Sequence, residues 1–312
     1  MSLLERVFGR VAGPLAAVQC AADRVTALRL ERHGTRLRVA ASASVPLPPG
    51  SLAPDLHAAN VRDTAAVRAA LTGALTRVGQ PARVLLLLPD ASARVAVVHL
   101  ATIPARADEL REVLRWQVKK SLPFPVEESR IAWSQPIARD GGWDVVVTAA
   151  RASVVGEYEA AVAAAGSEPG IVDVPGLGVV NAARTVAPTA ADWMVLHGTA
   201  AWVTAAVFRG TTLLYLRGRE ADGGLPALTD MAHQTAMYHE DRLQGAPVSH
   251  VVTCGSLTWT PDVHEALRQR LGCVVETLSL DAVVDDPGRL VHDADAVLPM
   301  AGAVSTYEEG EA

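Results

Sequence analysis

Cysteine is scarce in this chain of 312 residues, which contains only Cys20, Cys254 and Cys273. No two of them form a Cys-x-x-Cys pair, so the sequence supports neither a disulfide framework nor a zinc ribbon, and a reducing compartment is expected. Long apolar runs are also missing, because no run approaches the roughly 18–20 residues that a membrane-spanning helix needs. The first ten residues alternate in charge and lack the apolar stretch of a secretory signal peptide. These absences predict a soluble, cytoplasmic protein.

An excess of positive charge is absent as well. The formal net charge is −6, which argues against a basic groove for nucleic acid. Hydrophobic residues make up 50% and charged residues 20% of the chain, as in ordinary globular proteins and unlike disordered ones. Single hydrophobic cores stop growing at roughly 250–300 residues, so a chain of this length is expected to divide into two or more lobes.

The same order of elements is expected twice along the chain. Alternating apolar residues and helical spacings predict three strands, a helix and a further strand near the start, and again after residue 190. The first set covers residues 15–20, 25–30, 37–45, 64–78 and 84–89, and the second covers 194–196, 201–209, 211–217, 225–244 and 248–254. Such a repeat predicts two similar α/β lobes.

A smaller unit interrupts the first lobe. Residues 93–149 are expected to form a strand, the helix Ala107–Lys120 and two more strands, joined by a turn at 139–142. The predicted organisation is a first lobe in two parts (1–90 and 151–190), an inserted α+β subdomain (91–150) and a second lobe (191–312), with residues 306–312 as a frayed tail. Two ribonuclease-H-like lobes facing each other are the architecture of the actin and sugar-kinase ATPases.

Catalytic and metal-binding patterns are not found. His233 and His239 are six residues apart and do not share one helix face, so no metal site is predicted. Ser153 and Ser256 are not in a nucleophile elbow, which leaves hydrolase chemistry without support. The pair Gly176-Leu-Gly178 lacks the third glycine of a dinucleotide fingerprint. We therefore expect no catalytic residue of these classes.

The segment Leu110–Glu128, which contains Pro123-Phe124-Pro125, resembles a family. It is similar to the helix and "IPFPLEE" segment of PilM, the cytoplasmic actin-like component of type IV pilus assembly. Met1–Arg10, Val84–Pro89 and Val172–Pro175 resemble that family's leader and two of its strands, in the same order. The resemblance spans most of the chain and implies an actin-like fold, a role in pilus assembly or related secretion, and a peripheral location at the inner membrane.

The first phosphate loop departs from the family pattern. PilM proteins open with GIDIGSSSVK, and its Asp, loop Gly and Lys fall on Gln19, Ala21 and Thr26. Glutamine carries no charge to neutralise magnesium, and alanine lets backbone amides approach a phosphate less closely than glycine does. The loop therefore lacks the acidic residue and the glycine that would bind a magnesium-bound triphosphate.

The second hairpin departs in the same way. The family's Asp-Ile-Gly falls on Leu196, His197 and Gly198, so its acidic residue is missing, and the adenine-side Gly-Gly falls on Cys254 and Gly255. Loss of both acidic residues predicts a fold without working ATPase chemistry and without a required cofactor. Gly198 and Gly255 persist, so the sequence leaves weak nucleotide binding open.

The resemblance also implies a partner. In PilM proteins, a groove between the first lobe and the inserted subdomain takes the N-terminal tail of PilN, and here Trp116, Lys120 and Phe124 are the candidates to line it. Plainer interpretations stay open: Phe124 and Trp116 as core residues, and Lys119-Lys120 as a pair that complements the helix dipole.

Other interpretations of the chain also stay open. Leu3, Leu4, Val7, Phe8 and Val11 fall on one helical stripe, which suits contact with a membrane or a partner. The rival functions are an active actin-like ATPase and a cytoplasmic scaffold lobe of the GspL type. The GspL family continues into a membrane span that this sequence does not show.

Overall fold

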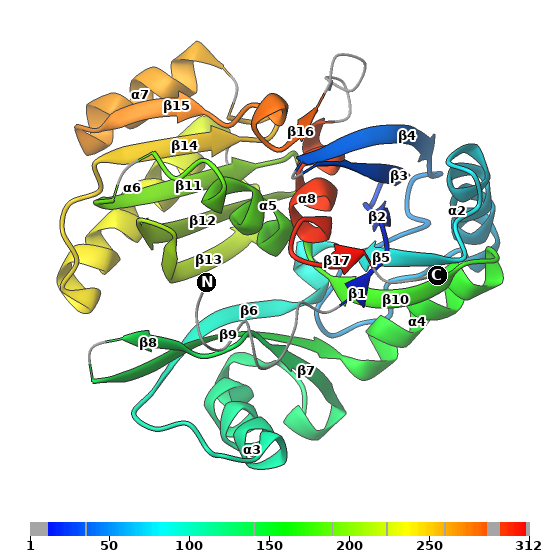
Figure 1. Ribbon diagram of the computed structural model, residues 1–312, viewed down its shortest axis with the longest axis horizontal. Coiled ribbons are helices and arrows are strands. Elements are labelled where there is room, and N and C mark those ends of the chain that lie inside the picture. The colour runs from blue at the N-terminus through cyan, green and yellow to red at the C-terminus, as the bar shows by residue number, and fades with distance from the viewer. Residues whose placement is uncertain are drawn as a thin grey trace.

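The computed structural model describes residues 12–34, 36–139, 141–188, 190–222, 224–258, 260–285 and 294–309. The leader and the predicted stripe in residues 3–11 lie outside these residues. Figure 1 shows two lobes, each built on a sheet, with two helices between them and a smaller subdomain beside both.

The first lobe contains a mixed six-stranded sheet. Its strands, in spatial order, are β10 (Glu168–Asp173), β5 (Arg83–Leu87), β2 (Ala16–Cys20), β3 (Arg24–His33), β4 (Arg36–Pro46) and β16 (Val284–Asp285). β2, β3 and β4 are antiparallel neighbours, whereas β5 and β10 run parallel to β2. Helices α2 (Thr64–Arg77) and α4 (Ala152–Ala164) bury their apolar residues against one face. The Asp63 side chain caps α2 as the sequence predicts, by accepting from the Ala66 amide.

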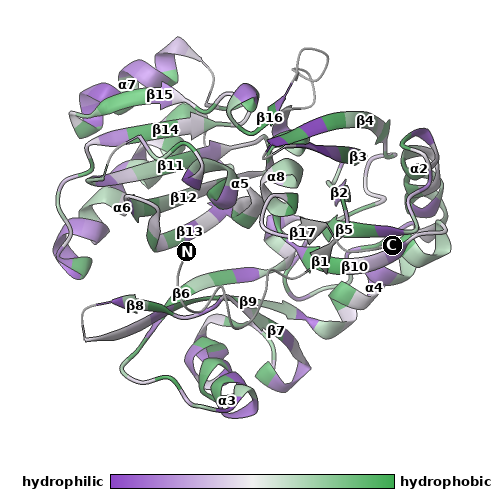
Figure 2. Cartoon of the chain, viewed as in Figure 1, coloured by the Kyte–Doolittle hydropathy of each residue, from purple (hydrophilic) through white to green (hydrophobic). Residues whose placement is uncertain are grey.

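The second lobe repeats this plan. Its five strands, in spatial order, are β13 (Thr212–Glu220), β12 (Trp202–Arg209), β11 (Asp192–Gly198), β14 (His250–Cys254) and β15 (Val274–Thr277). β11, β12 and β13 are antiparallel, and β14 and β15 run parallel to β11. Helices α6 (Gly224–Leu243) and α7 (Pro261–Leu271) cover one face. Figure 2 shows that β5 is mostly apolar and the outer helix α7 mostly polar. The predicted duplication is confirmed.

Two helices join the lobes through a very close contact. α5 (Pro175–Arg184) and α8 (Ala294–Val304) lie side by side between the sheets (Figure 1). A Cβ atom on Gly178 would lie 2.1 Å from the carbonyl oxygen of Pro299, and one on Gly302 would lie 2.0 Å from that of Gly178. Glycine is therefore required at both positions for the helices to approach.

The end of the chain returns to the first lobe. β16 pairs with β4, and β17 (Glu308–Glu309) pairs with β1 (Ala12–Gly13). The predicted second lobe, 191–312, therefore gives its last part to the first sheet and to the helix pair, and the tail expected to fray is strand at β17. Edge strands offer unpaired backbone groups, and these pairings satisfy them.

The inserted subdomain is a four-stranded sheet with one helix. Its strands are β6 (Arg94–Leu100), β7 (Ser129–Trp133), β8 (Ile137–Arg139) and β9 (Gly142–Arg151). Helix α3 (Ala107–Val118) packs Leu110, Leu114 and Val118 into a separate core with residues of β9. The helix ends two residues before the predicted Lys120, because a 3-10 turn begins at Lys119. β8 was not predicted from the sequence.

Candidate functional site

The carboxyl ends of the parallel strands meet at the cleft between the lobes. In the first lobe these are the ends of β2, β5 and β10, and in the second lobe those of β11 and β14. Ligands of open α/β sheets bind beyond this edge of the strands. The candidate site therefore consists of the last residues of these strands and the loops that continue from them.

Two side chains at this edge carry buried polar atoms that have no partner among the described residues. Gln19 shares the face of β2 that carries Ala17, and its Oε1 atom is buried without a hydrogen bond among the described residues. His197 holds the corresponding place on β11. It is 1% exposed, and neither ring nitrogen has a partner in the described part of the chain. Burial lowers the pKa of His197 to about 4, although Asp295 acts in the opposite direction, so the ring is neutral at pH 7.

Side chains alternate between the two faces of β11, so the position along the strand decides which residue faces helices α5 and α8. His197 lies on the same face as Val195, which belongs to the core between the lobes. Leu196, onto which the family's acidic residue falls, lies on the opposite face, in the core under α6. The family resemblance pointed to the loss of an acidic residue at Leu196. It did not show that the neighbouring His197 is the polar side chain on the face toward the core between the lobes.

The turn between β2 and β3 uses its own backbone groups. The Ala21 amide donates to the Arg24 carbonyl oxygen at 2.9 Å, so this amide is occupied within the turn. Thr26 is 1% exposed, and its hydroxyl lies 3.1 Å from that of Ser44 on β4. These two predicted cleft residues therefore bond within the first lobe.

The two glycines of the second lobe pack against each other. Gly255 has a φ of +90°, and a Cβ atom there would lie 2.4 Å from the carbonyl oxygen of Gly198. The Leu257 amide also donates to that oxygen, at 3.0 Å. A Cβ atom on Gly198 would meet side-chain atoms of Thr258 and Leu228 at 3.0 and 3.1 Å. Packing of the loop after β14 thus explains both glycines without a bound phosphate.

Two carboxylates that the sequence analysis did not single out lie at the same edge. Asp90 comes shortly after β5, and its Oδ1 atom accepts from the Gly176 amide at 2.9 Å. Burial raises the pKa of Asp90 to about 7, against this hydrogen bond and with help from Asp173. Burial likewise raises the pKa of Asp173, at the end of β10, to about 6. The sequence signal that could have identified Asp90 is an aspartate shortly after an apolar strand.

A cavity of about 280 Å³ opens beside Asp90. Its walls come from three parts of the protein: residues 54–56, Asp90 and the start of α5 in the first lobe, Ala91 and residues 93–95 at the start of the insert, and strands β12 and β13 of the second lobe. Trp202, Thr204 and Glu220 are among the side chains from the second lobe. The cavity is therefore a junction of all three units.

A buried amide fixes the first-lobe rim of this cavity. Asn60 is fully buried, and its Oδ1 atom accepts from the Asp55 amide at 3.1 Å, the Ser92 hydroxyl at 2.6 Å and the Tyr158 hydroxyl at 3.0 Å. These bonds tie the loop before α2 to the start of the insert and to α4. The rim is thus held without a partner.

The three predicted partner-binding residues lie in different surroundings. Phe124 is 6% exposed and sits where the insert meets the first lobe, with the Arg151 guanidinium 5.8 Å from its ring centre. Arg151 also donates to the His57 carbonyl oxygen at 2.6 Å and to the Glu128 carboxylate at 2.7 Å. Trp116 is 73% exposed on α3, which excludes a core role for it.

Lys120 is exposed in the 3-10 turn after α3. None of Trp116, Lys120 and Phe124 lines the cavity at the junction. The structure therefore places Phe124 at the boundary between insert and first lobe, and the other two on the outer surface of the insert.

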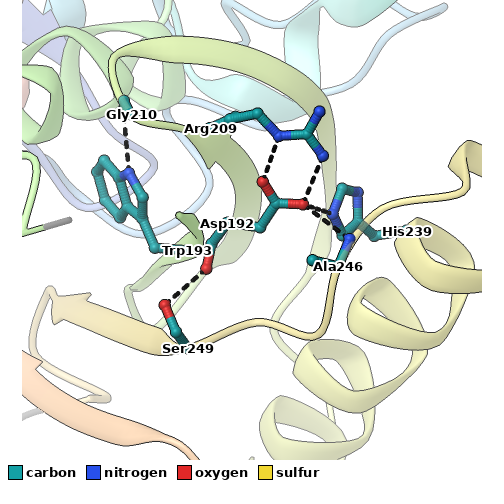
Figure 3. A network of polar contacts seen from close by, with 7 residues as sticks. All are labelled: Asp192, Trp193, Arg209, Gly210, His239, Ala246 and Ser249. Carbon is teal, nitrogen blue, oxygen red and sulfur yellow. Dashed lines mark hydrogen bonds and ion pairs between the residues drawn. The ribbon is translucent and has the colours of Figure 1, made fainter. Parts of the chain in front are cut away.

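At the far end of β11, a charged group is fully partnered. Asp192 is 1% exposed and accepts from Arg209, from His239 at 2.8 Å and from the Ala246 amide at 3.0 Å (Figure 3). Burial alone would raise its pKa, but these hydrogen bonds lower it to about 2. His239 is 0% exposed, so this aspartate–histidine pair is a structural element of the second lobe.

Metal-binding clusters are not found in the described ranges, where no set of three or more histidine, cysteine or acidic side chains is placed to share an ion. None of the helices described here combines the length and apolarity needed to span a bilayer.

Comparison with known proteins gives one sequence family and several related structures. Residues 18–242 match the family of the type IV pilus assembly protein PilM. No curated protein matches the chain. A PilM-PilN type IV pilus biogenesis complex has a TM-score of 0.73 at 20% identity, covering 95% of this chain and 97% of that one. A Bacteroides thetaiotaomicron protein with an actin-like ATPase fold and unknown function has a TM-score of 0.51 at 10% identity, covering 91% and 96%.

The cytoplasmic domain of EpsL, an inner membrane component of the type II secretion system of Vibrio cholerae, has a TM-score of 0.48 at 14% identity, covering 82% of this chain and 93% of that one. The first two likenesses confirm the expected actin-like fold with duplicated lobes. The sequence match extends over most of the chain, from β2 into α6. The chain belongs to the PilM family of type IV pilus assembly proteins.

Proposed function

We propose that this protein is a PilM-type adaptor that works without ATP hydrolysis. It would bind the cytoplasmic N-terminal tail of a PilN-like inner-membrane protein, and so be held at the cytoplasmic face of that membrane. The observation that carries the proposal is the chemistry at the ends of β2 and β11. Gln19 lies where the family has one acidic residue, and His197 follows Leu196, where the family has the other. The related solved structure is described as a complex of PilM with PilN.

The side chains at the ends of β2 and β11 argue against metal-assisted catalysis. A magnesium-bound triphosphate needs carboxylates near the metal, and hard cations take oxygen ligands, commonly charged ones. Gln19 offers one neutral oxygen, and the neutral imidazole of His197 suits softer metals. Gly255 packs against the Gly198 backbone, so these two glycines are explained by packing within the second lobe. Binding of a partner, without chemistry, is the function that these features support.

The boundary between insert and first lobe offers a place for an extended peptide. Phe124 leaves only a small apolar edge at this boundary, and Arg151, Glu128 and the His57 carbonyl form a polar contact beside it. Extended peptides gain affinity from main-chain hydrogen bonds and specificity from side-chain pockets. Trp116 and Lys120 would extend this surface onto the insert.

A binding titration tests the adaptor role. A fluorescent peptide with the N-terminal tail of the PilN-like partner is titrated with the full chain. We expect saturable binding that weakens roughly tenfold in Phe124→Ala and Trp116→Ala, because aromatic anchors dominate such interfaces. Val274→Ala, at an exposed apolar residue on β15, is the matched control. Unchanged affinity in both aromatic variants would reject the assigned surface, and no binding would reject the adaptor role.

Nucleotide hydrolysis is the second candidate function, and Asp173 favours it. A carboxylate with a pKa of about 6 at the end of a cleft strand has the acidity of a general base. Titration with magnesium-ATP and a phosphate-release assay separates the two functions. Turnover that Asp173→Asn abolishes would establish the ATPase and overturn the proposal of a non-hydrolysing adaptor.

A further inference from the structure

The cavity at the three-way junction has an acidic lining. Asp55 and Asp90 of the first lobe and Glu220 of the second lobe contribute carboxyl groups. Arg94 is the one basic residue among the described residues of the wall. Arg94 is exposed, and its charge acts on Tyr215 of β13. Asp90 is the least exposed of these three acids, and a cation beside it would favour its charged form.

A second polar group faces the same space. Thr204 is 2% exposed and lines the cavity, and its hydroxyl makes no hydrogen bond within the described residues. A Cβ atom on Gly176 would lie 2.8 Å from Asp90 Oδ1 and 3.1 Å from Thr204 Oγ1. The carboxylate and the hydroxyl thus lie side by side across from the start of α5. A hydroxyl that lines a cavity and makes no hydrogen bond within the protein can accept from a ligand or donate to one.

An aromatic wall completes the cavity. Trp202 lies against Gly218 of the neighbouring strand, where a Cβ atom would be only 2.5 Å from the indole Nε1 atom. Glycine at 218 therefore lets the indole lie flat against β13, with the ring forming part of the lining. Indole faces attract cations, most of all guanidinium groups.

We propose that this cavity binds the cationic side chain of an extended peptide, a guanidinium or an ammonium group, with the Asp90 carboxylate as its charge partner and the Thr204 hydroxyl as a second acceptor. Where the peptide is taken to be the tail of the PilN-like partner, this inference rests on the proposed function. The volume, about 280 Å³, lies just below the roughly 300–1,000 Å³ typical of pockets for drug-sized ligands, and so suits one long side chain.

Occupancy of the cavity joins the three units. The cation would contact Asp90 where the first lobe passes into the insert, Thr204 and Trp202 on the second lobe, and Asp55 on the rim of the first lobe. β6 and β13 already run next to each other in Figure 1, so the ligand would bridge an existing boundary. A ligand that touches both lobes favours the lobe arrangement in which all its contacts form.

Two small probes test the site without the partner. N-acetylarginine amide and its neutral counterpart N-acetylcitrulline amide are titrated into the full chain, with the indole N–H of Trp202 followed by NMR. We expect saturable binding of the arginine probe, at least tenfold weaker binding of the citrulline probe, and at least a tenfold loss for the arginine probe in Asp90→Asn. Asp262→Asn, at an exposed acid on α7, is the matched control and should change nothing. Equal binding of both probes, or an unchanged affinity in Asp90→Asn, would overturn the proposal.

The side-chain amide oxygen introduced by Asp90→Asn can still accept from the Gly176 amide, so this variant should fold, and its unfolding transition is measured alongside. Thr204→Val is the second variant, because it keeps the shape and removes the acceptor. We expect a threefold or greater loss of affinity for the arginine probe. If neither Asp90→Asn nor Thr204→Val changes the affinity of the arginine probe, the probe binds elsewhere. That result would reject the site.

A third arm uses the partner's tail peptide with its basic residues intact and with each replaced by a neutral analogue. If the arginine probe binds through Asp90 but neither tail peptide binds, the cavity assignment stands and the adaptor function fails. If both tail peptides bind with equal affinity and the arginine probe does not bind, the adaptor function stands and the cavity assignment is overturned.

Discussion

Strand β11 buries a polar side chain at each end and treats the two differently. Asp192, at its start, is charged and accepts hydrogen bonds from a guanidinium, an imidazole and a backbone amide. His197, near its end, is equally buried and has no partner among the described residues. Native structures satisfy nearly all buried polar groups, so exceptions call for an explanation. Asp192 is thus part of a hydrogen-bonded network within the second lobe, whereas His197 lies without a partner among the described residues on the face of β11 that packs into the core between the lobes.

Removing Asp192 should have the largest effect on stability. Asp192→Ala leaves the buried His239 without its acceptor and also removes an acceptor of Arg209 and that of the Ala246 amide. A buried polar group without its partner costs about 1–3 kcal/mol, and more where a charged group is involved. Urea denaturation monitored by circular dichroism measures the loss. Asp262→Ala, at an exposed acid, is the control and should change the unfolding free energy by less than about 0.5 kcal/mol. A loss below about 1 kcal/mol for Asp192→Ala would show that the two ends of β11 do not differ as described.

Alanine at Gly255 should have the next largest effect. The position combines a φ of +90° with a Cβ contact to the Gly198 backbone at 2.4 Å, and each such strain costs on the order of 1–3 kcal/mol. Gly272 offers a matched control, since its φ is +65° and nothing lies within 4 Å of its Cβ position. We expect Gly255→Ala to lose clearly more unfolding free energy than Gly272→Ala. Equal losses would mean that the cleft-side loop is free to move away from Gly198.

Replacing His197 should have a small effect of the opposite sign. His197→Leu removes a buried imidazole that makes no hydrogen bond within the described residues, so at pH 7 the variant should be as stable as the parent or about 1 kcal/mol more stable. The same urea experiment measures this difference. A destabilisation above about 1 kcal/mol would indicate that the ring has a partner in solution.

The pH dependence of stability sharpens the comparison across the cleft. The raised pKa of Asp90, about 7, means that the folded state keeps a proton that the unfolded state has released, so this group makes stability fall as pH rises from about 4 to 7. The lowered pKa of His197, about 4, does the reverse between about pH 4 and 6.5. Asp90→Asn should therefore steepen the rise of stability with pH, and His197→Leu should flatten it. Parallel curves for both variants and the parent would contradict these two environments.

The overall fold could be predicted from the sequence because duplication and alternation are local signals. Apolar residues alternating along β3 and β4, and helical spacing along α2, identify the first lobe, and the same order after residue 190 identifies the second. β16 and β17 are two residues long, and they form by pairing with strands that are distant in sequence. No pattern within such short segments carries that information.

The candidate site was only partly predictable. The family's motif predicts which acidic residues are missing. Which face of β11 packs toward the first lobe is a property of the folded strand, and that face carries His197 and not Leu196. Asp90 lies next to Thr204 because the lobes meet there, and their sequence separation gives no hint of it. Trp116 and Phe124, close in sequence, have opposite exposure because the helix ends between them.

One calorimetric experiment tests the central claim most directly: the tail peptide of the PilN-like partner is titrated into the full chain, once without nucleotide and once with magnesium-ATP. An adaptor that does not use ATP should give the same saturable binding isotherm in both titrations, with the ATP intact afterwards. Peptide binding that requires ATP, or release of phosphate during the titration, would contradict it.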